Sequence, residues 1–87
     1  MKRSKRGAMF LKRIPHERAV LAYWMAKRGF TMTYADKTGV YTFVNGEDEN
    51  DQVAIVAEGD GYTFTRGNEN TQCLDQNALR IHIEETI

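Results

Sequence analysis

The sequence predicts an α+β fold in which one N-terminal α-helix packs on a four- to five-stranded antiparallel sheet made of two consecutive β-hairpins. Apolar residues recur at helical spacing over residues 15–28 and then alternate with polar residues from residue 30 onward. Short glycine-containing stretches separate the alternating runs, as the turns of hairpins require. At 87 residues the chain has the size of one domain. We expect this domain to span residues 8–87 behind a flexible basic arm at residues 1–7.

The predicted helix at residues 15–28 has recognisable start and stop signals. Pro15 suits the first helical position, because its missing N–H would have no partner there. Glu17 lies in the first turn, where its charge complements the helix dipole. Gly29 supplies the left-handed residue that commonly ends a helix. Trp24 belongs to the apolar stripe that faces the sheet, so we expect its ring to be largely buried.

Two hairpins are predicted after the helix. The first joins strands at residues 30–35 and 40–44, and the second joins strands at residues 53–57 and 62–66. We expect the acidic stretch between the two hairpins to be a loop. The side chains expected to pack under the helix are those of Phe30, Met32, Tyr41, Phe43, Val53, Ile55, Tyr62 and Phe64.

The C-terminal residues 71–87 allow two interpretations. Leu79, Ile81 and Ile83 alternate with polar residues, which is typical of a strand. Leu79 and Ile83 also share one face of a helix. Because β-branched residues favour strands, we expect a short fifth strand here, with a helix as the alternative.

The sequence Tyr-Thr-Phe occurs at residues 41–43 and again at residues 62–64. An internal duplication would explain the repeat, but these residue types are also favoured in strands generally. In either case, the second and fourth strands of an up-and-down sheet run in the same direction, so both finish at the same end of the sheet. The acidic stretch that begins at Glu47 is thereby predicted to lie near Glu69.

A formal net charge of zero conceals a strong separation of charge along the chain. Residues 1–30 contain nine cations and one acid, whereas residues 31–87 contain three cations and eleven acids. Such asymmetry indicates a partner with a charged surface, or mutual neutralisation of the two halves within the fold.

The acidic half suggests protein binding. We expect its carboxylates to form an acidic rim that approaches a basic groove on a nuclease, a polymerase or a nucleic-acid-guided complex. An ordinary solvated rim is the alternative explanation. The candidate protein-binding residues are Glu47, Asp48, Glu49, Asp51 and Glu69.

The basic half suggests direct nucleic-acid binding as an alternative function. Lysine and arginine side chains that neutralise phosphates give a salt-sensitive and largely sequence-independent affinity. The rings of the two Tyr-Thr-Phe motifs would add a base-stacking face to the sheet, although the same rings are needed as core beneath the helix. The candidate nucleic-acid-binding residues are Lys2, Arg3, Lys5, Arg6, Lys12, Arg13, Arg18, Lys27 and Arg28.

No catalytic, metal or cofactor site is predicted. His16, Cys73 and His82 are isolated in the sequence and lack the close paired spacing of metal ligands. They also lack a local signature of nucleophilic catalysis. The single cysteine suits a reducing, cytoplasmic setting. No apolar run reaches the length that a membrane-spanning helix needs, so no membrane partner is expected.

Together these features predict a small non-enzymatic binding protein that acts on nucleic-acid machinery through protein–protein contacts. Its size and charge are those of the accessory and inhibitor proteins that phages and mobile elements carry. Direct nucleic-acid binding through residues 1–30 is the first alternative. A small structural or assembly subunit is the second, because an exposed Met9-Phe10-Leu11 could seed a homo-oligomer.

Overall fold

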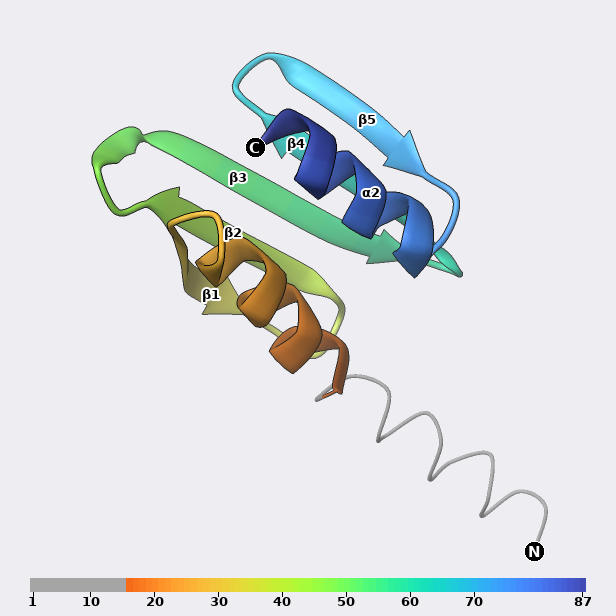
Figure 1. Ribbon diagram of the computed structural model, residues 1–87. Coiled ribbons are helices and arrows are strands. Elements are labelled where there is room, and N and C mark those ends of the chain that lie inside the picture. Colours follow the sequence, from red (N-terminus) through yellow and green to blue (C-terminus); the bar gives the residue numbers. More distant parts are fainter. Residues whose placement is uncertain (1–15) are drawn as a thin grey trace, which may run out of the picture.

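The computed structural model describes residues 16–87, so the expected basic arm and Met9-Phe10-Leu11 lie outside the described part. Residues 16–26 are helical and are called the N-terminal helix below. The elements that follow it are β1 (Phe30–Ala35), β2 (Val40–Asn45), β3 (Asp48–Glu58), β4 (Gly61–Arg66), β5 (Glu69–Cys73) and α2 (Gln76–Thr86) (Figure 1). The α+β class predicted from the sequence is confirmed.

The described residues form two layers. The five strands make one antiparallel sheet in the sequential order β1-β2-β3-β4-β5. Both helices lie on the same face of this sheet, the N-terminal helix toward β1 and β2 and α2 over β4 and β5 (Figure 1). The core fills the space between the layers and consists of Leu21, Met25, Phe30, Tyr41, Phe43, Val53, Ile55, Tyr62, Phe64, Cys73, Leu79 and Ile83.

Glycines with positive φ let the chain reverse direction at two important places. The N–H of Gly29 (φ 86°) donates to the carbonyl of Ala26 at 3.0 Å and closes the turn after the N-terminal helix. Gly39 (φ 99°) lies in the β1–β2 turn, where an added Cβ would come within 2.9 Å of the Ala57 Cβ. A side chain at Gly39 would therefore strain the backbone and clash with β3.

Helix packing differs from the sequence prediction at Trp24. Glu17, Leu21 and Met25 recur at intervals of four residues and form the buried stripe of the N-terminal helix. Trp24 is displaced by about 100° around the helix from Met25, and it is only partly buried against the edge of the core. The prediction that Trp24 is largely buried is wrong. The helix also ends two residues earlier than predicted.

The C-terminal tail is the helix α2, and the strand predicted there is wrong. The fifth strand is instead β5, which pairs with β4. Asp75 explains the start of α2, because its carboxylate accepts a hydrogen bond from the Ala78 N–H at 2.8 Å and so caps the helix. Leu79 and Ile83, four residues apart, form the buried face of α2.

The acidic stretch between the predicted hairpins belongs to a strand rather than a loop. β3 begins at Asp48, opposite Asn45, and a register shift separates this pair from the neighbouring pair of Val44 and Gln52. β3 is therefore longer than the strand predicted at residues 53–57, and its first residue, Asp48, pairs with Asn45.

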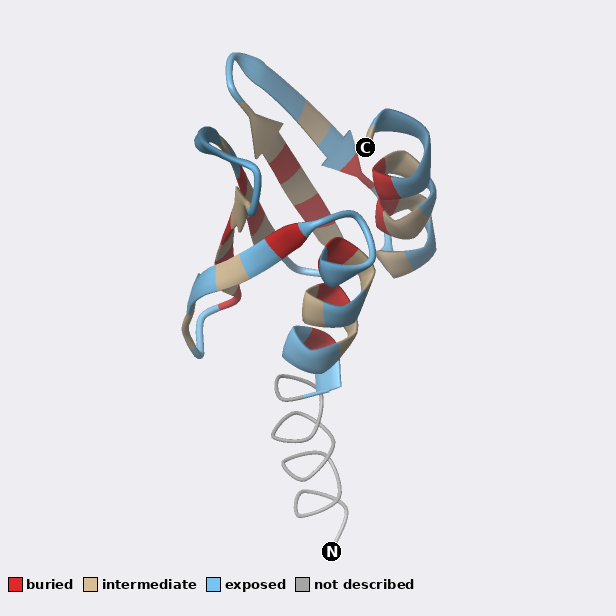
Figure 2. Ribbon diagram, turned by 60° about the vertical axis from the view of Figure 1, so that its left-hand side comes forward, coloured by how far each residue is buried: buried red, intermediate tan, exposed pale blue. Residues whose placement is uncertain are grey.

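The aromatic rings of the two Tyr-Thr-Phe motifs all face the helices. Tyr41, Phe43, Tyr62 and Phe64 are at most 4% exposed, and Figure 2 shows that the strands carry buried bands separated by less buried ones. These rings cannot stack on nucleobases, so the predicted base-stacking face of the sheet is wrong.

Candidate binding surfaces

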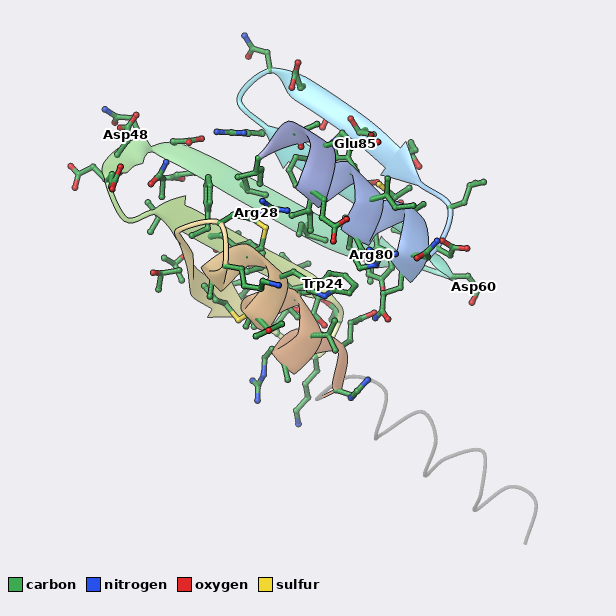
Figure 3. The ribbon with its side chains drawn as sticks, in the orientation of Figure 1. Trp24, Arg28, Asp48, Asp60, Arg80 and Glu85 are labelled. Carbon is green, nitrogen blue, oxygen red and sulfur yellow. The ribbon has the colours of Figure 1, made fainter. Side chains whose placement is uncertain are left out.

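The acidic rim lies at one end of the sheet. β2 and β4 run in the same direction, so the β2–β3 and β4–β5 turns lie at the same end (Figure 1). Cross-strand pairs close these turns, Asn45 with Asp48 and Arg66 with Glu69. Four of the five rim residues are exposed, namely Glu47, Asp48, Glu49 and Glu69. Figure 3 shows Asp48 at the tip of the hairpin.

Asp51 differs from the other rim residues because its carboxylate is held by the fold. Arg66 donates to both of its oxygens, from Nε to Oδ1 at 3.0 Å and from Nη2 to Oδ2 at 2.8 Å. Asn45 donates to Oδ2 at 3.1 Å. The hydrogen bonds from Arg66 and Asn45 hold the pKa of Asp51 below its ordinary value. Asp51 thus joins β3 to β2 and β4. The four exposed carboxylates lie in or beside the β2–β3 and β4–β5 turns.

The predicted basic residues divide into two groups. Arg18, Lys27 and Arg28 lie in or just after the N-terminal helix, and all three are exposed. Lys27 and Arg28 line a cleft between this helix and α2, together with Arg80, which the sequence analysis did not single out. The basic residues outside the described part are Lys2, Arg3, Lys5, Arg6, Lys12 and Arg13.

Sequence reasoning missed a buried polar contact centred on Glu17. This residue is 3% exposed, and its carboxylate accepts hydrogen bonds from the Tyr41 hydroxyl at 2.7 Å and from the Tyr62 hydroxyl at 2.5 Å. The two tyrosines hold equivalent positions in the repeated Tyr-Thr-Phe motif. Burial, and then the hydrogen bond to Glu17, raises the pKa of the Tyr41 hydroxyl. The spacing of four residues from Glu17 to Leu21 was the available signal, since it places Glu17 on the buried stripe.

The other chemically reactive residues do not converge. Cys73 is buried, and burial raises the pKa of its thiol. The ring of His82 packs edge-on against Phe64 with centroids 4.7 Å apart, while His16 is exposed at the start of the described helix. No group of three histidine, cysteine or acidic residues within 16–87 is placed to hold a metal ion. Neither helix described by the structure combines the length and the apolar character needed to cross a membrane.

No protein-family model, curated protein or solved structure matches this chain.

Proposed function

We propose that the protein is a non-enzymatic binding protein that engages a basic groove on a component of the nucleic-acid machinery through the acidic end of its sheet. The partner class is a nuclease, a polymerase or a nucleic-acid-guided complex. In this proposal the protein acts as an accessory or inhibitor protein of the kind that phages and mobile elements carry. The observation that carries the proposal is the convergence of four exposed carboxylates from two hairpins, those of Glu47, Asp48, Glu49 and Glu69.

The arrangement suits electrostatic recognition. None of the four carboxylates forms a salt bridge with another residue in 16–87, so their charges are free to act on a partner. The Asp51–Arg66 contact joins β3 to β4, and two of the four carboxylates, those of Asp48 and Glu49, project from β3. Charges fixed at the rim of an interface raise the rate of encounter with an oppositely charged surface and reject partners of like charge.

A matched pair of charge reversals tests the proposal. The tip variant changes Glu47→Lys and Glu49→Lys. The control variant changes Glu58→Lys and Asp60→Lys, which are exposed at the opposite end of β3 and add the same charge. The partner is first captured from a nuclease-treated lysate and identified by mass spectrometry, and association is then measured with the purified partner.

We expect the tip variant to associate about tenfold more slowly than the wild type, with a smaller change in the dissociation rate. The control variant is expected to associate nearly as fast as the wild type. Equal effects of the two variants would show that only net charge matters. An unchanged rate for the tip variant would reject the acidic end as the binding surface.

A further inference from the structure

Basic side chains are concentrated at the cleft between the N-terminal helix and α2, although residues 16–87 as a whole are acidic. Residues 16–87 contain six lysines and arginines against twelve acids. Three of these six, Lys27, Arg28 and Arg80, line the cleft between the N-terminal helix and α2. Figure 3 shows Arg28 and Arg80 near Trp24 in the space between the helices. Half of the described cations thus lie at a single cleft, and such a concentration attracts an anionic ligand.

Neighbouring acids offset only part of this charge. Arg80 forms a salt bridge with Glu84 at 3.1 Å and donates to the Asn77 Oδ1 at 2.7 Å, and these contacts orient its guanidinium. Glu84 is the one acid among the residues that line the cleft. Lys27 and Arg28 form no salt bridge with any residue that the structure describes. The Lys27 ammonium lies 5.3 Å from the ring centre of the exposed Tyr23, so Lys27 and Arg28 leave the cleft with a positive charge that no acid among the described residues neutralises.

Trp24 adds an aromatic surface to the same cleft. Its ring packs against the edge of the core but stays partly exposed, and Ile83, which is 1% exposed, closes the floor. Aromatic rings stack with nucleobases regardless of sequence, and cations beside them bind the phosphates. A stacking ring flanked by three cations is the combination that single-stranded nucleic acid requires.

We propose that single-stranded nucleic acid binds across the mouth of this cleft, with one base stacked on the exposed part of the Trp24 ring and the adjoining phosphates held by Lys27, Arg28 and Arg80. This activity goes beyond the protein contacts proposed above and uses a different surface. Duplex DNA fits less well, because its bases are stacked on one another and cannot lie on the indole ring. Affinity should depend little on sequence, since every base has a stacking face.

Trp24 also reports on the cleft, because it is the only tryptophan in the chain. Oligothymidylate added to the full-length protein is expected to quench the Trp24 fluorescence, and labelled oligothymidylate gives the affinity by anisotropy. Arg28→Ala should weaken binding about tenfold and reduce the log–log salt slope by about 0.7. Arg18→Ala is the matched control, because it removes an exposed arginine of the N-terminal helix that does not line this cleft. The control is expected to bind more tightly than the Arg28 variant.

Trp24→Leu tests the stacking contact, and we expect it to weaken binding about tenfold. Urea unfolding checks that this variant folds, and Arg28→Ala keeps the proposal testable if it does not. The proposal is overturned if oligothymidylate leaves the Trp24 fluorescence unchanged, or if a duplex of the same length binds as tightly. It is also overturned if heparin quenches the Trp24 fluorescence as strongly as oligothymidylate does, which would make the cleft a general polyanion site. Equal weakening of binding by Arg18→Ala and Arg28→Ala would overturn it as well.

Discussion

Glu17 is the residue on which the position of the N-terminal helix depends most directly. Its carboxylate is buried and accepts hydroxyl groups from β2 and from β4, so one side chain ties the helix to the middle of the sheet. A buried charge is tolerated when each of its oxygens is hydrogen-bonded, and it becomes costly when a donor is lost. The contact therefore fixes helix placement as well as adding stability.

We expect Tyr62→Phe to lower the free energy of unfolding by about 1–3 kcal/mol, because it leaves one oxygen of the buried Glu17 carboxylate without its donor. The triple change Glu17→Leu, Tyr41→Phe and Tyr62→Phe removes the charge together with both donors, so its stability should lie closer to the wild type. Urea unfolding measures both variants. A triple variant less stable than Tyr62→Phe would contradict this account of the contact.

Asp36 gives the protein a defined acid sensitivity. Hydrogen bonds from the Thr38 hydroxyl, the Tyr34 hydroxyl and the Val40 N–H lower the pKa of Asp36 to about 2, from an ordinary value of 3.8. The folded state therefore binds this proton less readily than the unfolded state does, so the contribution of Asp36 to stability is present above pH 3.8 and is lost as the pH falls toward 2. Asp36→Asn should give a shallower loss of stability across this range in acid titrations of unfolding. A parallel curve for the variant would argue against this role of Asp36.

Among the helices and strands, those whose position depends on local sequence patterns could be predicted from the sequence. The N-terminal helix, the first four strands and their glycine turns follow from periodicity and turn chemistry. The tail was predicted as a strand because Leu79, Ile81 and Ile83 fit the strand period, whereas only Leu79 and Ile83 share the buried helix face. The N-cap at Asp75 was the deciding signal, and it lies four residues before this alternation begins.

The candidate binding surfaces could be predicted from the sequence less completely than the helices and strands. The meeting of two acidic turns follows from strand order alone, and so it could be predicted. The pairing of Asp51 with Arg66 depends on the β3–β4 register, which no local pattern encodes. The cleft that contains Trp24 and Arg80 requires the relative placement of two helices, one of which was predicted only as the alternative to a strand.

Asp75 is the N-cap of α2, so its side chain should contribute to the stability of that helix. Asp75→Ala removes the acceptor of the Ala78 N–H and is expected to cost about 1 kcal/mol of unfolding free energy. Asp75→Asn keeps an oxygen acceptor and serves as the control, with a smaller expected loss. Thermal and urea unfolding would measure both. Equal stability of Asp75→Ala and the wild type would show that the cap does not limit α2.

Across the whole molecule, Arg66 links the two layers at the acidic end. It lies on β4, donates twice to Asp51 on β3, and donates to the carbonyl of Thr86 at the end of α2 at 3.2 Å. Its guanidinium also lies 5.5 Å from the ring centre of Phe30 on β1. One cation thus connects four elements beside the carboxylates that we propose as the binding surface.

We therefore expect Arg66→Ala to lower the free energy of unfolding by about 1–3 kcal/mol, since it removes charge-assisted hydrogen bonds to a half-buried acid. Arg80→Ala is the matched control, because its exposed pair with Glu84 within α2 should contribute about 0.5 kcal/mol or less. Hydrogen exchange adds a local readout: Arg66→Ala should speed exchange of the amides in the first half of β3, where Asp51 lies, and Arg80→Ala should not. If both variants lose the same stability and leave β3 unchanged, Arg66 is an ordinary surface arginine, and the acidic end is held in place by backbone pairing alone.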